Sequence, residues 1–89
     1  MSPQQGDGWV FTPRALRDMR RLDRPVQRRI VQALDRLVDD PPVGDVVRLT
    51  GSDDEWRLRV GDWRVRFTRD ADRLILVTRV LPRGRAYRD

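Results

Sequence analysis

The feature that most constrains the fold is the segment from Glu55 to Phe67, EWRLRVGDWRVRF, which alternates apolar and basic residues around Gly61-Asp62. Period-two alternation is typical of half-buried strands, so two such runs around a Gly-Asp turn predict an antiparallel hairpin. Gly-Asp is a weaker turn signal than Asn-Gly, and it leaves the register open by one residue. One face would carry the apolar residues Trp56, Leu58, Val60, Trp63, Val65 and Phe67. The opposite face, called the arginine face below, would carry Arg57, Arg59, Arg64 and Arg66.

The composition is that of one small domain, because 89 residues with 38% apolar content build only a modest core. Residues 1–8 are polar with Pro and Gly, so we expect a disordered extension there and a single domain over residues 9–89. The absence of Cys and His excludes disulfides, thiolate metal sites and His-based acid–base chemistry. No apolar run approaches the ~18 residues of a membrane span, and the N-terminus lacks a signal-peptide core. We therefore expect a cytoplasmic protein with no membrane partner.

The charge points to a polyanionic partner. The formal net charge is +5, and all nineteen basic residues are arginine. Arginine binds phosphate bidentately and stacks on bases, so a small basic domain favours nucleic acid as a ligand. GC-rich coding would explain the absence of lysine equally well, but it does not explain why arginines gather on one face of the hairpin.

The remaining chain predicts an α+β fold. Trp9 to Phe11 form a short strand candidate, and Thr12-Pro13 then predicts a helix start that leads to about Leu22. A second helix is predicted from Asp23 to about Val38, and the short link between the two makes a two-helix hairpin. Three or four antiparallel strands follow, the last and central one over residues 73–81. We expect both helices on one face of the sheet.

The arginine face, joined by Arg83 after the last strand, is a candidate surface for a phosphodiester backbone. Tyr87 adds a ring that could stack on a base and a hydroxyl that could move a proton. Metal-dependent cleavage would need clustered carboxylates, and Asp53-Asp54-Glu55 is the single cluster. We therefore expect neither a metal ion nor another cofactor. The pattern alone is equally compatible with an ordinary solvated basic surface.

The sequence resembles the RelE/ParE toxin superfamily of bacterial and archaeal toxin–antitoxin systems. The resemblance rests on the order of elements and on three segments: Arg48 to Gly51, Trp56 to Val65, and Arg83 to Tyr87. It covers nearly the whole chain, from Trp9 to Arg88. In the RelE branch, the toxin enters the ribosomal A site and cuts mRNA without a metal ion, and the 2′-hydroxyl of the RNA attacks the adjacent phosphate.

The resemblance also implies roles for the site residues. Arg57 and Arg59 match the paired basic residues that grip the RNA, and Arg64 matches the arginine thought to stabilise the transition state. Arg83 and Tyr87 match the tail pair near the scissile phosphate. The predicted catalytic set is thus Arg64, Arg83 and Tyr87, and the predicted RNA- and phosphate-binding set is Arg57, Arg59, Arg66 and Arg85.

The tail departs from the family pattern at two positions. Many relatives carry His immediately before the tail arginine, where this chain has Pro82, and Gly84 replaces an expected basic residue. No His or Lys substitutes for them, so the resemblance does not identify the group that moves protons. Tyr87 is the one obvious titratable candidate in the tail.

Two alternatives to RNA cleavage remain. The ParE branch inhibits DNA gyrase and usually lacks the tail arginine–tyrosine pair, so Arg83 and Tyr87 favour the RelE-like interpretation. A non-catalytic relative that binds only RNA or an antitoxin is the third hypothesis. In each case the family implies a cognate antitoxin, expected from an adjacent gene, whose acidic segment would wrap the domain and cover the arginine face.

Overall fold

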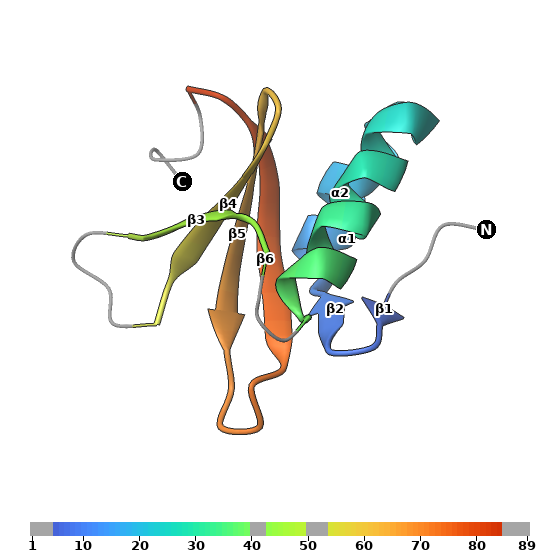
Figure 1. The fold of residues 1–89 in the computed structure, drawn as a ribbon. Coiled ribbons are helices and arrows are strands. Elements are labelled where there is room, and N and C mark those ends of the chain that lie inside the picture. Colours follow the sequence, from blue (N-terminus) through green and yellow to red (C-terminus); the bar gives the residue numbers. More distant parts are fainter. Residues whose placement is uncertain (1–4, 40–42, 50–53, 85–89) are drawn as a thin grey trace.

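The computed structural model describes residues 5–39, 43–49 and 54–84, which form two helices against one face of a six-stranded sheet (Figure 1). The predicted α+β class, with the helices on one face, is confirmed. The sheet order is β1-β2-β6-β5-β4-β3. In chain order the elements are β1 (Gln5–Gly6), β2 (Trp9–Phe11), α1 (Pro13–Arg20), α2 (Arg24–Leu37), β3 (Asp45–Arg48), β4 (Trp56–Val60), β5 (Trp63–Arg69) and β6 (Ile75–Pro82).

Both helices begin where the sequence predicts. The hydroxyl oxygen of Thr12 accepts a hydrogen bond from the Ala15 N–H at 3.2 Å, and Pro13 occupies the first turn of α1. The helix ends at Arg20, slightly earlier than the predicted Leu22. The apolar side of α2 faces the sheet, and its buried residues are Ile30, Leu34 and Leu37.

Strands β3 to β6 form an antiparallel meander, as predicted, and β6 is central. The sequence analysis did not predict that β2 pairs in parallel with β6, nor that Gln5–Gly6 forms β1 against β2. The described residues therefore begin at Gln5, before Trp9. Residues 1–4 lie outside the described part, and the domain boundary at residue 9 stays a prediction.

Helix α1 completes the hydrogen bonding of β6 where β2 ends. Strand β2 covers only the first residues of β6, up to Val77. Just beyond, the Thr12 N–H donates to the carbonyl oxygen of Val77 at 2.9 Å. The Asp18 carboxylate then accepts hydrogen bonds from the Val80 N–H at 2.9 Å and from Nε of Arg79 at 2.8 Å. The Val77 carbonyl and the Val80 N–H, which lie on the edge of β6 beyond β2, thus both have hydrogen-bond partners, as buried backbone groups require.

The core lies between the sheet and the helices and includes Trp9, Ile30, Leu34, Val65, Phe67 and Val77. Trp56 and Trp63, which the alternation places on the apolar face of the hairpin, pack against the margin of the core and stay partly exposed. On the far side of β6, Leu76 is exposed, so that face has only partial cover. Neither α1 nor α2, nor any other helix within the described ranges, is long and apolar enough to cross a membrane.

Candidate active site

The predicted hairpin is present, and its register settles which residues share a face. Strands β4 and β5 pair Arg57 with Arg66 and Arg59 with Arg64. The alternate pairs, including Leu58 with Val65, point into the core. The four arginines predicted to share a face therefore do so. Like charges directly opposite each other across a sheet are destabilising, so this face needs compensation from other groups or from an anionic ligand.

The turn between the two strands is tight because of Gly61. Its φ of 57° lies in the left-handed region that favours glycine, and a glycine at the first central position is what a type II′ turn requires. Val60 pairs with Trp63, so the loop contains only Gly61 and Asp62. The turn therefore fixes the register that the sequence left open.

Arg64 lies almost completely inside the protein, with only 9% of its surface exposed. Its Nη1 donates hydrogen bonds to the carbonyl oxygens of Gly61 at 2.9 Å and Trp63 at 3.0 Å. Within the described residues, Arg64 forms no salt bridge to a carboxylate. Backbone carbonyls orient this guanidinium without neutralising it, so its full positive charge stays available to a ligand.

The electrostatics around Arg64 are strongly positive. Burial is the largest influence that lowers the pKa of Arg64 below its ordinary value. The charges of Arg57, Arg59 and Arg83 lower it further, and the Asp45 carboxylate acts in the opposite direction. Because arginine keeps its proton in proteins, the consequence is a concentrated positive potential rather than a neutral side chain.

Arg83 directly follows β6 and lies at the same end of the sheet. Pro82, the last residue of β6, pairs with Trp63, and the Arg83 N–H donates to the carbonyl oxygen of Asp62 at 2.8 Å. The predicted catalytic arginines Arg64 and Arg83 are thus brought together at the Gly61-Asp62 turn. The sheet aligns two residues that are far apart in sequence, which is what a phosphate-binding pocket needs.

Arg59 and Arg66 of the arginine face each form a salt bridge with a carboxylate among the described residues. Nε of Arg59 lies 2.9 Å from Asp45 on the neighbouring strand β3, and both side chains are more than half exposed. Nη2 of Arg66 lies 2.9 Å from Glu55, in a less exposed setting. An exposed pair is weak and exchanges easily with a ligand, whereas the Arg66 pair supports the fold more strongly. The predicted phosphate-binding role of Arg66 would require it to exchange Glu55 for phosphate.

The other predicted site residues divide into two groups. Arg57 lies in the middle of β4 with Arg66 opposite, on the same face as Arg64. Tyr87 and Arg85 lie outside the described residues, and their predicted roles stay predictions. The Asp53-Asp54-Glu55 cluster is described only from Asp54 onward, and in the described part of the chain no three acidic residues come together as metal ligands.

Arg79 is a fifth arginine on this face, and the sequence analysis missed it. It pairs with Arg66 across β5 and β6, next to an irregularity in the ladder at Arg66 and Phe67. Its polar character inside the apolar run of residues 73–81 is a signal that could have identified it. The contact of Arg79 with Asp18 has no sequence signal, because the two residues are 61 positions apart. This pair closes the side of the face next to α1.

Comparison with known proteins places the chain in a family. The model of the ParE toxin of the type II toxin–antitoxin system, parDE, matches residues 10–87. A chain in the archaeal RelE–RelB complex from Pyrococcus horikoshii OT3 is 28% identical, with a TM-score of 0.68, and the match covers 85% of this chain and 93% of that one. A chain in the toxin–antitoxin complex RelBE2 from Mycobacterium tuberculosis is 26% identical, with a TM-score of 0.67, over 84% of this chain and 95% of that one.

A third structure supports the fold alone. A chain in the RelB–RelE antitoxin–toxin complex from Methanococcus jannaschii is 21% identical, with a TM-score of 0.73, over 88% of this chain and 94% of that one. No curated protein matches the sequence. Because the family model spans most of the chain, the protein belongs to the ParE toxin family of type II toxin–antitoxin systems, within the RelE/ParE toxin superfamily.

Proposed function

We propose that this type II toxin inhibits translation as a ribosome-dependent endoribonuclease, which cuts mRNA in the ribosomal A site without a metal ion. The observation that carries the proposal is the cluster of arginines at the Gly61-Asp62 turn. There a buried Arg64 is held by two backbone carbonyls, beside Arg83, which directly follows β6. Such a preorganised positive site suits the charge that develops on a phosphate during cleavage. The proposed place of action is the cytoplasm, where mRNA is translated.

The proposed reaction is an internal transfer within the RNA. The 2′-hydroxyl oxygen attacks the adjacent phosphorus, the bond from phosphorus to the 5′-oxygen breaks, and a 2′,3′-cyclic phosphate and a 5′-hydroxyl result. One proton leaves the 2′-oxygen and one joins the departing 5′-oxygen. Arg64 and Arg83 would stabilise the extra negative charge on the non-bridging oxygens. Arg57 and Arg59 would hold the flanking backbone.

Proton transfer is assigned to Tyr87 in this proposal. The chain has no histidine, and arginine is a poor base because it keeps its proton. A tyrosine hydroxyl can donate or accept one proton, although its ordinary pKa of ~10 makes it a slow base at neutral pH. The proposal therefore predicts slow turnover on free RNA and faster cleavage on the ribosome, where the RNA is held in position.

The second candidate function is inhibition of DNA gyrase. The observation that favours it is the family model itself, which is that of the ParE toxin. Against it, two of the similar solved structures above 25% identity are named as RelE–RelB or RelBE complexes. The arginine face also offers a surface for a phosphodiester, which gyrase poisoning through protein contacts does not require.

The test is primer extension on mRNA after brief induction of the toxin. We expect cuts at fixed positions within codons, lost in Arg64→Ala and in Arg83→Ala. The matched control is Arg28→Ala on the exposed side of α2, which should cut like the wild type. Intact mRNA together with an SOS response and inhibited gyrase supercoiling would support the gyrase hypothesis instead. Normal growth without an antitoxin would indicate a non-catalytic relative.

A further inference from the structure

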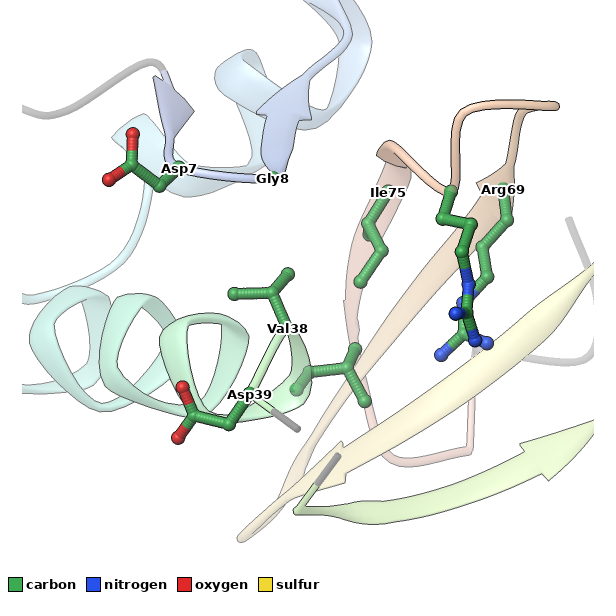
Figure 2. Close-up of a pocket in the computed structure, with 8 residues that line it drawn as sticks. Asp7, Gly8, Val38, Asp39, Arg69 and Ile75 are labelled. Atoms are coloured by element: carbon green, nitrogen blue, oxygen red, sulfur yellow. The ribbon is translucent and has the colours of Figure 1, made fainter. Parts of the chain in front are cut away.

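A cavity of about 440 Å³ lies at the opposite end of the sheet from the Gly61-Asp62 turn (Figure 2). It opens between the C-terminal end of α2 and the turn that joins β5 to β6. Its apolar lining comes from Leu37, Val38 and Ile75. Leu37 and Ile75 are buried core residues, so this lining is a rigid floor rather than a mobile surface.

Charges of both signs surround that floor. Arg69 and Arg73 line the cavity, and so do Asp7 and Asp39. Figure 2 shows Arg69 across the cavity from the two carboxylates, with Val38 and Ile75 between them. Within the described residues, neither Arg69 nor Arg73 forms a salt bridge, although two carboxylates share the cavity with them. Both guanidinium groups can therefore bind an external anion.

Arg69 is held in place by aromatic rings. Its guanidinium carbon lies 5.7 Å from the ring centre of Trp56 and 5.8 Å from that of Phe67. Arg48 lies 5.3 Å from the same Trp56 ring. Ring faces attract a cation and restrict its motion, but they do not neutralise it. Arg69 is thus positioned in advance for a carboxylate without the entropy cost of ordering a free side chain.

Arg73 occupies a backbone conformation that arginine rarely adopts. Its φ of 65° lies in the left-handed region, at a turn position where glycine or asparagine is favoured. Asp70 fixes this turn, because its side chain accepts hydrogen bonds from the N–H groups of Asp72 at 2.8 Å and Leu74 at 2.9 Å. The Arg73 N–H donates to the carbonyl oxygen of Asp70 at 3.0 Å. An arginine at this position suggests a role for its side chain that outweighs the backbone cost.

The mixture of charges identifies the class of ligand. A nucleic-acid backbone would bring phosphates close to Asp7 and Asp39 as well as to the two arginines, and the repulsion would cancel much of the attraction. A protein segment can match both signs, and its apolar side chain can cover Leu37, Val38 and Ile75. The partner that the family supplies is an antitoxin, as in the RelE–RelB and RelBE2 complexes.

We propose that this cavity docks a segment of the cognate antitoxin. One apolar side chain of the segment packs on the floor, and a neighbouring Glu or Asp accepts hydrogen bonds from Arg69 and Arg73. This surface lies at the other end of the sheet from Arg64 and Arg83, so the antitoxin would be anchored away from the proposed RNA-cleaving site. The inference rests on the antitoxin partner and not on RNA cleavage, so either can fail without the other.

The test is the affinity of purified toxin for the antitoxin encoded by the adjacent gene, measured by isothermal titration calorimetry. Arg73→Gly removes one guanidinium and also relieves the positive φ, so the fold should be retained. We expect the dissociation constant to rise at least tenfold while Tm stays equal to or above that of the wild type. Arg28→Gln, an exposed arginine on α2, is the matched control and should bind within twofold of the wild type.

Two further readouts keep the outcome decisive. In methyl NMR spectra, adding the antitoxin should shift the signals of Ile75 and Val38, which line the floor. Unchanged affinity in Arg73→Gly, or unshifted methyl signals, would overturn the proposal. Weaker binding of a 20-nucleotide single-stranded RNA with unchanged antitoxin affinity would also overturn it, because RNA would then be the occupant.

Discussion

The two ends of β5 hold their arginines in similar ways, and the middle of the strand does not. At one end, Arg64 is bound by backbone carbonyls, and at the other end Arg69 lies against aromatic rings. Between them, Arg66 is paired with Glu55. Carbonyls and rings orient a cation and leave its charge, whereas a carboxylate cancels it. The difference separates cations that are ready for a ligand from cations that support the fold.

The two ends also differ from each other. The Arg64 end gathers several arginines around one buried guanidinium, whose pKa is lowered first by burial and then by the neighbouring positive charges. The Arg69 end mixes both signs of charge over an apolar floor. The first arrangement suits a phosphate, and the second suits a protein segment. The predictions below would break or sharpen these distinctions.

The largest expected effect is at Arg64. Arg64→Lys keeps the charge, and its ammonium group could still reach the two carbonyls that Nη1 contacts. The variant loses the remaining nitrogens of the planar guanidinium, which would bind a phosphate bidentately. We expect cleavage of ribosome-bound mRNA to fall by about 10²-fold, the order found when one preorganised donor of an active site is lost. Single-turnover cleavage assays would measure it. Equal cleavage by the lysine variant would mean that only the charge matters and that the planar guanidinium does not.

The next effect is on stability, at Asp18. Asp18→Ala removes the acceptor of the Val80 N–H and a carboxylate partner of Arg79, both in a mostly buried setting. We expect a loss of about 2–3 kcal/mol in the free energy of unfolding, measured by urea denaturation. Asp18→Asn keeps an oxygen for the Val80 N–H and should lose clearly less. Similar losses in the two variants would show that the charge, rather than the edge hydrogen bond, carries the stabilisation.

A smaller effect is expected at Glu55. Glu55→Gln weakens the pair with Arg66, and because Glu55 is partly exposed the cost should be about 1 kcal/mol. The released Arg66 should then bind RNA more tightly, which fluorescence anisotropy with a labelled RNA can detect. If Glu55→Gln bound RNA more weakly than the wild type, the result would contradict the idea that the Glu55 carboxylate keeps Arg66 in a structural role and away from RNA.

The smallest effect is expected at Asp45. Its pair with Arg59 is exposed on both sides, so Asp45→Asn should change stability by less than about 0.5 kcal/mol. Asp45 partly offsets the positive potential at Arg64, so its removal should strengthen RNA binding most at low salt. Titrations at two salt concentrations would test this. A large loss of stability in Asp45→Asn would show that β3 depends on the pair.

The hairpin and the helices could be predicted because each follows from a local pattern. Alternation in residues 55–67 assigned the two faces, and Thr12-Pro13 marked the start of α1. The parallel pairing of β2 with β6 could not be predicted, since it joins segments more than sixty residues apart with no shared signal. The same reason explains the missed contact between Asp18 and Arg79.

At the site, alternation assigned the arginines to a face but not to their partners. The sequence pattern treats Arg64 and Arg66 alike, because both are basic residues at equivalent positions of one strand. The structure distinguishes them through Gly61, whose turn presents a carbonyl to Arg64, and through Glu55, which reaches Arg66. Such differences depend on side-chain paths across strands, which periodicity does not record.

The measurement that tests the central claim most directly is cleavage of mRNA on purified, programmed ribosomes by three toxins: wild type, Arg64→Ala and Arg69→Gln. The account predicts that wild type and Arg69→Gln cut at the A-site codon at similar rates, while Arg64→Ala leaves the mRNA intact. Intact mRNA with the wild type, or equal cleavage by Arg64→Ala, would contradict the claim that the Arg64 end of the sheet is the active end.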